Sequence, residues 1–155
     1  GYTFSEKITP SGGIIGTTTN DDACAGCVGE FISSNIAAGS AVALTTATTV
    51  NLTSISLTAG DWNVWCNGYF NANAATSVTS AAVGISNTSA TFATPSINQG
   101  NTQWVGTIVG ATPAITTGFF RQSLSGTTTV YCVAISNFTI NTNAVYGTMF
   151  ARRQR

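Results

Sequence analysis

The sequence predicts a single all-β domain, an antiparallel jelly-roll-like sandwich of about eight or nine strands. Short runs rich in Val, Ile, Thr and aromatic residues recur along the chain, Gly, Asn and Ser turns separate them at regular spacing, and no stretch has a convincing helical period. The chain has 155 residues, of which 43% are hydrophobic. One domain is therefore expected, with a core that needs neither a disulfide nor a metal.

The chain divides into an N-terminal lead segment or arm, residues 1–23, and a sandwich domain, residues 24–155. Glycines, threonines and the Asn20-Asp21-Asp22 turn interrupt any periodicity in the arm. The strands of the sandwich are expected near residues 27–36, 41–45, 48–58, 61–72, 79–87, 102–110, 114–124, 128–139 and 144–153. Residues 87–101 form a long loop, and long loops on a rigid β scaffold often carry recognition.

Side-chain parity assigns faces to two of these strands. In residues 48–58, Val50 and Leu52 share one parity whereas Ile55 and Leu57 share the other, which predicts a bulge or bend near Thr53-Ser54. Residues 61–72 alternate strictly, which predicts one core face and one polar-aromatic outer face. The core face carries Trp62, Val64, Cys66, Gly68 and Phe70, and the outer face carries Asn63, Trp65, Asn67, Tyr69 and Asn71.

Charge is scarce, at 6% of residues with a net charge of zero. No electrostatic footprint for nucleic acid or an anionic membrane is visible, and no apolar run is long enough for membrane insertion. A monomer with so few charges tends to associate, which favours surface buried between subunits. The three Asn-x-Ser/Thr sequons, at Asn51, Asn87 and Asn137, are expected to be unglycosylated, because such triplets arise by chance in a Thr- and Asn-rich chain.

Four cysteines raise the question of a metal or redox site. Cys24 and Cys27 have CxxC spacing, but there is no second close pair and no histidine, and the residues that follow them read as strand. We therefore expect no bound zinc and no other cofactor. Cys66 and Cys132 share the parity of apolar neighbours and are expected to be buried, so that all four cysteines are unpaired thiols in a reducing compartment.

The chain contains few side chains that could transfer a proton or activate a nucleophile. The absence of histidine removes Ser-His and Cys-His arrangements, and the plausible carboxylates are only Asp21, Asp22, Glu30 and Asp61. We therefore expect no catalytic residues.

Binding needs less. The candidate ligand-binding residues are Trp65, Tyr69 and Trp104, which are suited to stacking on sugar rings or partner side chains. The alternative is that these rings simply pack the sheets.

Adjacent large residues indicate a second apolar environment. Neighbours in a strand point to opposite faces, so Phe119 and Phe120 cannot both enter one core, and Tyr131 and Cys132 pose the same problem. We predict that Phe119 and Tyr131 face neighbouring subunits. A closed ring, most simply a homotrimer, buries such residues without runaway association.

The order of several short motifs resembles structural modules of tailed-bacteriophage virions. The motifs are Gly16-Thr-Thr-Thr-Asn-Asp-Asp22, Gly26-Cys-Val-Gly-Glu30, Leu57-Thr-Ala-Gly-Asp-Trp62, Thr128-Thr-Val-Tyr131 and Tyr146-Gly to Ala151-Arg-Arg153. The resemblance implies a trimeric β-sandwich similar to the heads of tumour-necrosis-factor-like and C1q-like proteins, with no catalytic residues. It implies a virion location, assembly in the bacterial host cytoplasm, and other virion proteins as partners.

Four functions remain open from sequence. The first is the receptor-binding tip of a tail fibre, contacting a host-surface glycan or protein. The second is a capsid decoration or head-fibre protein with a structural role. A eukaryotic C1q-like ligand would show oxidised cysteines and glycosylated sequons, and a polysaccharide-degrading fibre domain would need more carboxylates than this chain offers.

Overall fold

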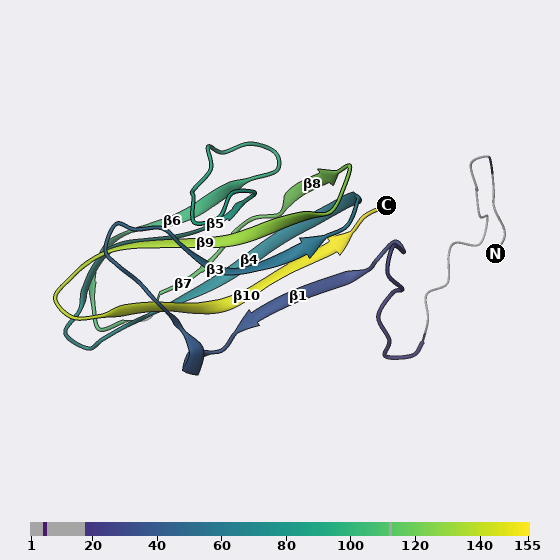
Figure 1. Ribbon diagram of the computed structural model, residues 1–155. Coiled ribbons are helices and arrows are strands. Elements are labelled where there is room, and N and C mark those ends of the chain that lie inside the picture. The colour runs from purple at the N-terminus through teal and green to yellow at the C-terminus, as the bar shows by residue number, and fades with distance from the viewer. Residues whose placement is uncertain (1–4, 6–17, 112) are drawn as a thin grey trace.

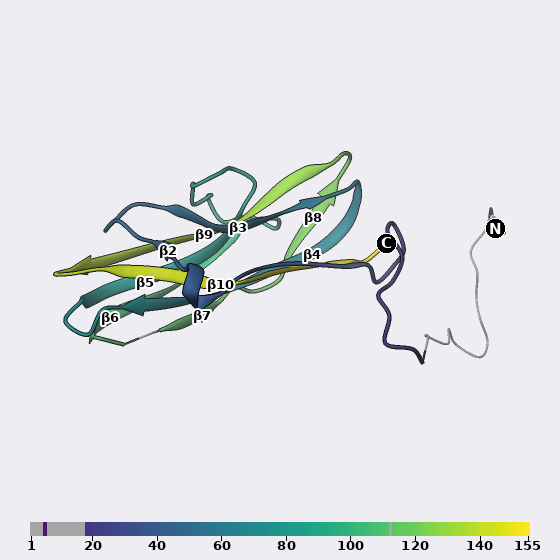
Figure 2. The same ribbon diagram turned by 60° about the horizontal axis from the view of Figure 1, so that its bottom comes forward.

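The computed structural model describes Ser5, residues 18–111 and residues 113–155, and in these it confirms the all-β sandwich (Figures 1 and 2). Two antiparallel sheets pack face to face, and one short 3-10 turn is the only helical element described. The elements are β1 (Phe31–Ile36), η1 (Ala38–Ser40), β2 (Val42–Ala43), β3 (Val50–Leu57), β4 (Gly60–Ala72), β5 (Ser77–Ser86), β6 (Gly100–Val109), β7 (Ala114–Thr116), β8 (Phe120–Leu124), β9 (Thr128–Thr139) and β10 (Asn143–Arg153). Within the described residues, no helix is long and apolar enough to span a bilayer.

In both sheets, strands from the beginning of the chain pair with strands from its end. Sheet A has the order β1-β10-β4-β7, with β2 also beside β10 and β8 also beside β4. Sheet B has the order β3-β9-β5-β6. The early strands thus pair with late ones, β1 with β10 and β3 with β9, while β4 pairs with β8 and β5 with β6 in between.

The sequence located the strands closely, with two differences. The run expected at 114–124 is broken, because the Thr117 hydroxyl accepts a hydrogen bond from the Cys66 amide at 2.9 Å and so ends β7. The run expected at 27–36 begins only at Phe31, after a disulfide-closed turn. The predicted irregularity in β3 is present, as a register shift between Asn51 and Thr53.

The core lies between the two sheets and is built from the inward parities predicted for β3 and β4. Leu52, Leu57, Trp62 and Phe70 are among its largest fully buried side chains. Gly68 lies close to sheet B, since a Cβ there would lie 2.5 Å from Cγ1 of Val83. A side chain at residue 68 would therefore push the sheets apart.

The expectation of four unpaired thiols is wrong, because all four cysteines form disulfides. Cys66 of β4 and Cys132 of β9 join the two sheets across the core, with their Cα atoms 6.2 Å apart, and both are fully buried, as predicted. Cys24 and Cys27 close a short turn before β1, with Cα atoms 5.3 Å apart. Parity had placed Cys66 and Cys132 in the core, but only the facing of the two sheets brings them within bonding distance.

Most of the predicted N-terminal arm, residues 1–23, lies outside the described residues. The described residues 18–30 lie at the same end of the sandwich as the C-terminus (Figures 1 and 2). Gly29 donates its amide to the Arg153 carbonyl at 3.0 Å, and Arg153 donates to the Glu30 carbonyl at 2.9 Å. These bonds continue the β1–β10 pairing back toward the Cys24–Cys27 turn.

Candidate subunit-contact and ligand-binding face

The outer face of sheet A carries six aromatic rings that we call the aromatic face. It consists of Phe31 on β1, Trp65 and Tyr69 on β4, Phe119 between β7 and β8, and Tyr146 and Phe150 on β10. Cross-strand register builds it, because Trp65 lies opposite Phe150 and Tyr69 lies opposite Tyr146. Residues that face each other across antiparallel strands point to the same side, so the rings meet in pairs.

Four of these rings form one contact group that runs across the sheet from β1 to the β7–β8 connection. The Trp65 ring stacks on Phe150 with centroids 5.2 Å apart and meets Phe119 edge-on at 4.9 Å. Phe31 leans on Phe150 at 5.8 Å. These offset and edge-on geometries are the favourable ones for aromatic pairs.

The second group is the tyrosine pair. Tyr69 and Tyr146 stack with centroids 5.3 Å apart and an interplanar angle of 17°. A polar row, with Asn67 opposite Thr148, separates this pair from the first group. Asn67 Oδ1 is buried, and no described residue donates a hydrogen bond to it.

The aromatic face is partly open to solvent. Phe119 is 70% exposed, Phe31 41% and Tyr69 39%, which is unusual for such large rings in one sheet. Within the four-ring group the rings contact one another, and exposed apolar patches, unlike single exposed residues, mark interaction sites.

An ion-pair network borders the face at its β8 corner. Arg121 donates from Nε and Nη2 to the two carboxylate oxygens of Asp61, each at 2.7 Å, and Arg155 Nε lies 3.0 Å from Asp61 Oδ2. The hydrogen bond from Arg121 holds the pKa of Asp61 below its ordinary value, against the desolvation that would raise it. Asp61 also raises the pKa of Arg121 through the same hydrogen bond.

A second ion pair is buried, and it joins Glu30, just before β1, to Arg153 at the end of β10. Arg153 Nε donates to Glu30 Oε2 at 2.8 Å, and its guanidinium lies 4.2 Å from the centroid of the Trp62 ring. Burial acts to raise the pKa of Glu30, but the hydrogen bonds from Arg153 and from the Gly26 amide outweigh it, so that this pKa is lowered. Both carboxylates are thus ionised and engaged by arginine near neutral pH.

The structure separates the residues proposed from sequence. Trp65, Tyr69 and Phe119 meet on the aromatic face. Trp104 on β6 instead packs against the core from sheet B. Tyr131 on β9 lies opposite Ser54 and Ser86, on the outer face of sheet B, so it does not share a surface with Phe119.

Three members of the aromatic face were missed from sequence, namely Phe31, Tyr146 and Phe150. The signal for two of them was present, because Tyr146 and Phe150 alternate with the buried Val145 and Met149. Their proximity to Trp65 and Tyr69 depends on β10 pairing with β4, which sequence alone does not indicate.

The loop of residues 87–99 is held in place from two sides. Asn51 on β3 donates to the Ser89 hydroxyl at 2.7 Å and accepts from the Ala90 amide at 2.6 Å. The buried Gln122 on β8 donates to the Asn98 carbonyl and accepts from Asn87 Nδ2 at 3.3 Å. Within this loop the apolar side chain of Ile97 is 81% exposed.

The sequon amides are all engaged inside the protein. The Asn51 and Asn87 amides bond as just described, and Asn137 Nδ2 donates to the Ser80 hydroxyl at 2.8 Å. The two disulfides agree with the oxidised cysteines that the C1q-like alternative expects.

Comparison with known proteins gives no relative. No protein-family model matches the chain, and no match emerges among curated proteins or solved structures.

Proposed function

We propose that this chain is a non-enzymatic virion protein of a bacteriophage, the homotrimeric receptor-binding or tip domain of a tail fibre. The observation that carries the proposal is the aromatic face, a sheet surface of half-exposed rings in a chain of very low charge. The phage motifs support the virion assignment by resemblance. The nested strand order supports a jelly roll, because β1 to β10 pair outside-in as in a long hairpin rolled onto itself.

A second copy of the chain is the occupant that suits the aromatic face. Between its two aromatic groups the face is neutral, with Asn67 opposite Thr148, and beside the four-ring group Arg152 lies opposite both Phe31 and Asn63. Burying one such ring contributes about 1.5–3 kcal/mol, and a ring of subunits repeats that gain at each interface.

A closed ring joins two different patches of each protomer. The edge strand β6 supplies a second apolar patch, since Val105 is 74% and Val109 62% exposed. We propose that β6 of one copy packs against the aromatic face of the next. Phe119 then lies at the contact, whereas Tyr131 lies on β9, which β5 separates from β6.

The state of the carboxylates supports a non-enzymatic role. Glu30 and Asp61 are held by arginines and have lowered pKa values, so neither is a ready proton donor near neutral pH. With no histidine in the chain, general acid-base catalysis lacks its usual groups.

Light scattering of the purified protein at micromolar concentration tests the trimer. A mass of about 48 kDa, three times the 15.9 kDa of one chain, supports the proposal, and a mass near 16 kDa ends it.

Immunogold labelling of virions tests the location. Label at the tips of tail fibres supports a receptor-binding tip that contacts a host-surface glycan or protein, and label on the capsid supports the decoration or head-fibre alternative. Virions without any label contradict both.

A further inference from the structure

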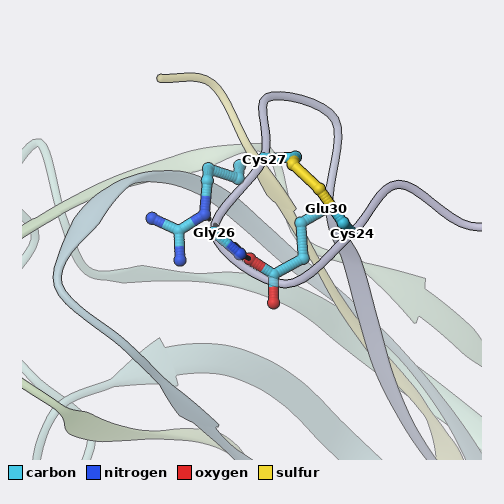
Figure 3. The surroundings of a disulfide bond; sticks show 5 residues. Cys24, Gly26, Cys27 and Glu30 are labelled. Carbon is cyan, nitrogen blue, oxygen red and sulfur yellow. Dashed lines mark hydrogen bonds and ion pairs between the residues drawn. A yellow bond between two sulfur atoms is a disulfide. The ribbon is translucent and has the colours of Figure 1, made fainter. Parts of the chain in front are cut away.

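The two disulfides differ in solvent access, which is one of the properties that govern exchange with external thiols. Cys66 and Cys132 have no solvent exposure and lie between the sheets. Cys24 is exposed and Cys27 is half-buried, in a turn at the end of the sandwich (Figure 3). Exchange requires attack by a thiolate on a sulfur, so access selects the Cys24–Cys27 bond.

The Cys24–Cys27 disulfide also contributes little to the global fold. It spans a sequence separation of 3, against 66 for the inter-sheet disulfide, and the entropy removed from the unfolded chain grows with loop length. The Cys24–Cys27 disulfide acts instead on the local conformation of the turn. It closes the turn in which the Cys27 amide bonds the Cys24 carbonyl at 2.9 Å.

That turn is connected directly to the buried ion pair. Closing it directs the Gly26 amide at Glu30 Oε2, 2.8 Å away (Figure 3). The same oxygen accepts a hydrogen bond from Arg153 Nε at 2.8 Å. Gly26 has a φ of +81° and Gly29 one of +91°, so both glycines take backbone conformations that favour this compact turn. The disulfide therefore braces the turn that enters β1.

We propose that Cys24–Cys27 is a thiol–disulfide exchange site for small dithiols, and that its redox state sets how firmly residues 18–28 are held to the sandwich. A dithiol thiolate attacks Sγ of Cys24, the Cys24–Cys27 bond breaks, and Cys27 leaves as a thiolate. The second thiol of the dithiol then displaces Cys24. The net change is transfer of two electrons and two protons, which leaves two cysteine thiols and a cyclic oxidised dithiol.

Reduction loosens the turn but leaves β1 in place. The bonds of Gly29 and Glu30 with the Arg153 backbone do not involve sulfur, and they anchor the start of β1 to β10. The effect is thus confined to the segment ahead of Gly29. This proposal does not depend on trimer formation, and a monomer can show it equally well.

Alkylation of the folded protein tests the exchange. The full chain is treated with dithiothreitol without denaturant, quenched with iodoacetamide and mapped by peptide mass. We expect alkylation of Cys24 and Cys27 and none of Cys66 and Cys132, with all four modified in a denatured control. An unmodified Cys24–Cys27 pair, or equal modification of all four cysteines, overturns the proposal.

Hydrogen exchange tests the consequence. In peptides covering residues 18–28, reduction should raise amide exchange at least about tenfold, with residues 31–36 unchanged. The C24S/C27S variant should show the fast exchange and no response to dithiothreitol. Unchanged amide exchange in the reduced protein and in the C24S/C27S variant overturns the proposal that the disulfide braces this turn. An equal rise in exchange in oxidised Glu30→Gln protein also overturns it, because the Glu30–Arg153 ion pair would then be what holds the segment.

Discussion

At the scale of single residues, Arg153 is the most heavily engaged side chain. Its three guanidinium nitrogens donate to Glu30, to the Ala59 carbonyl at 2.7 Å and to the Thr58 hydroxyl at 2.5 Å. The side chain is 5% exposed and lies over Trp62. One residue near the C-terminus thus ties together β1, the β3–β4 turn and the core.

Replacing Arg153 by methionine should cost about 3–5 kcal/mol of unfolding free energy, because it leaves the Glu30 carboxylate buried without its partner. Chemical unfolding at one fixed protein concentration measures this. The exposed neighbour Arg152 provides the control, and Arg152→Met should change the unfolding free energy by less than about 0.5 kcal/mol. Equal losses of unfolding free energy in the two variants would show that the buried hydrogen bonds of Arg153 do not stabilise the fold.

Asp61 predicts an acid-sensitive stability. Its pKa is lowered in the folded protein by the hydrogen bond from Arg121, with Arg155 adding a smaller effect. A carboxyl whose folded pKa lies below its ordinary value of 3.8 stabilises the fold above that pH, and the contribution is lost as the pH falls through the folded pKa. Asp61→Asn should therefore flatten the fall in unfolding free energy below pH 4, measured by unfolding from pH 7 to pH 3. An acid limb identical to that of the unmodified chain would contradict this.

At the scale of elements, the inter-sheet disulfide is the main covalent support. Cys66→Ala with Cys132→Ala should lower the unfolding free energy by about 2–4 kcal/mol, because the bond closes a long loop in the unfolded chain. The C24S/C27S variant should lose clearly less under the same oxidising conditions. Equal losses would mean that loop length does not govern the stabilisation.

The buried side-chain amide of Gln122 holds one of the two sides of the 87–99 loop. Gln122→Leu keeps the side-chain size but removes both of its hydrogen bonds, so Asn87 and the Asn98 carbonyl lose their partner. We expect a cost of about 1–3 kcal/mol and faster amide exchange in residues 87–99. Gln103→Leu, at an exposed site on β6, should leave the loop unchanged. A loop that stays protected in Gln122→Leu would assign its order to Asn51 instead.

At the scale of the whole molecule, the two outer faces make opposite predictions for assembly. Phe119→Ser, at a 70% exposed ring of the aromatic face, should shift the mass in light scattering from trimer toward monomer. Tyr131→Ser, on the outer face of sheet B, should leave the trimer intact. Loss of the trimer only in Tyr131→Ser would move the interface from the aromatic face and β6 to the outer face around β9.

The sequence by itself determined the fold class and which residues of β4 share each of its two faces. Period-2 alternation is a local property, and it assigned Trp62, Cys66 and Phe70 to the core and Trp65 and Tyr69 to an outer face. It also located the irregularity in β3, because a change of parity within one strand requires an extra residue.

Only the tertiary structure decided which faces and strands meet. Strand pairing brings Phe150 beside Trp65, sheet packing brings Cys132 to Cys66, and residues 123 positions apart form the Glu30–Arg153 pair. Trp104 alternates on β6 much as Trp65 does on β4, yet the partly buried Trp104 ring packs against the core and the Trp65 ring lies on an outer face. Alternation within a strand fixes which side chains share a face, but long-range pairing, which no local pattern encodes, fixes what that face contacts.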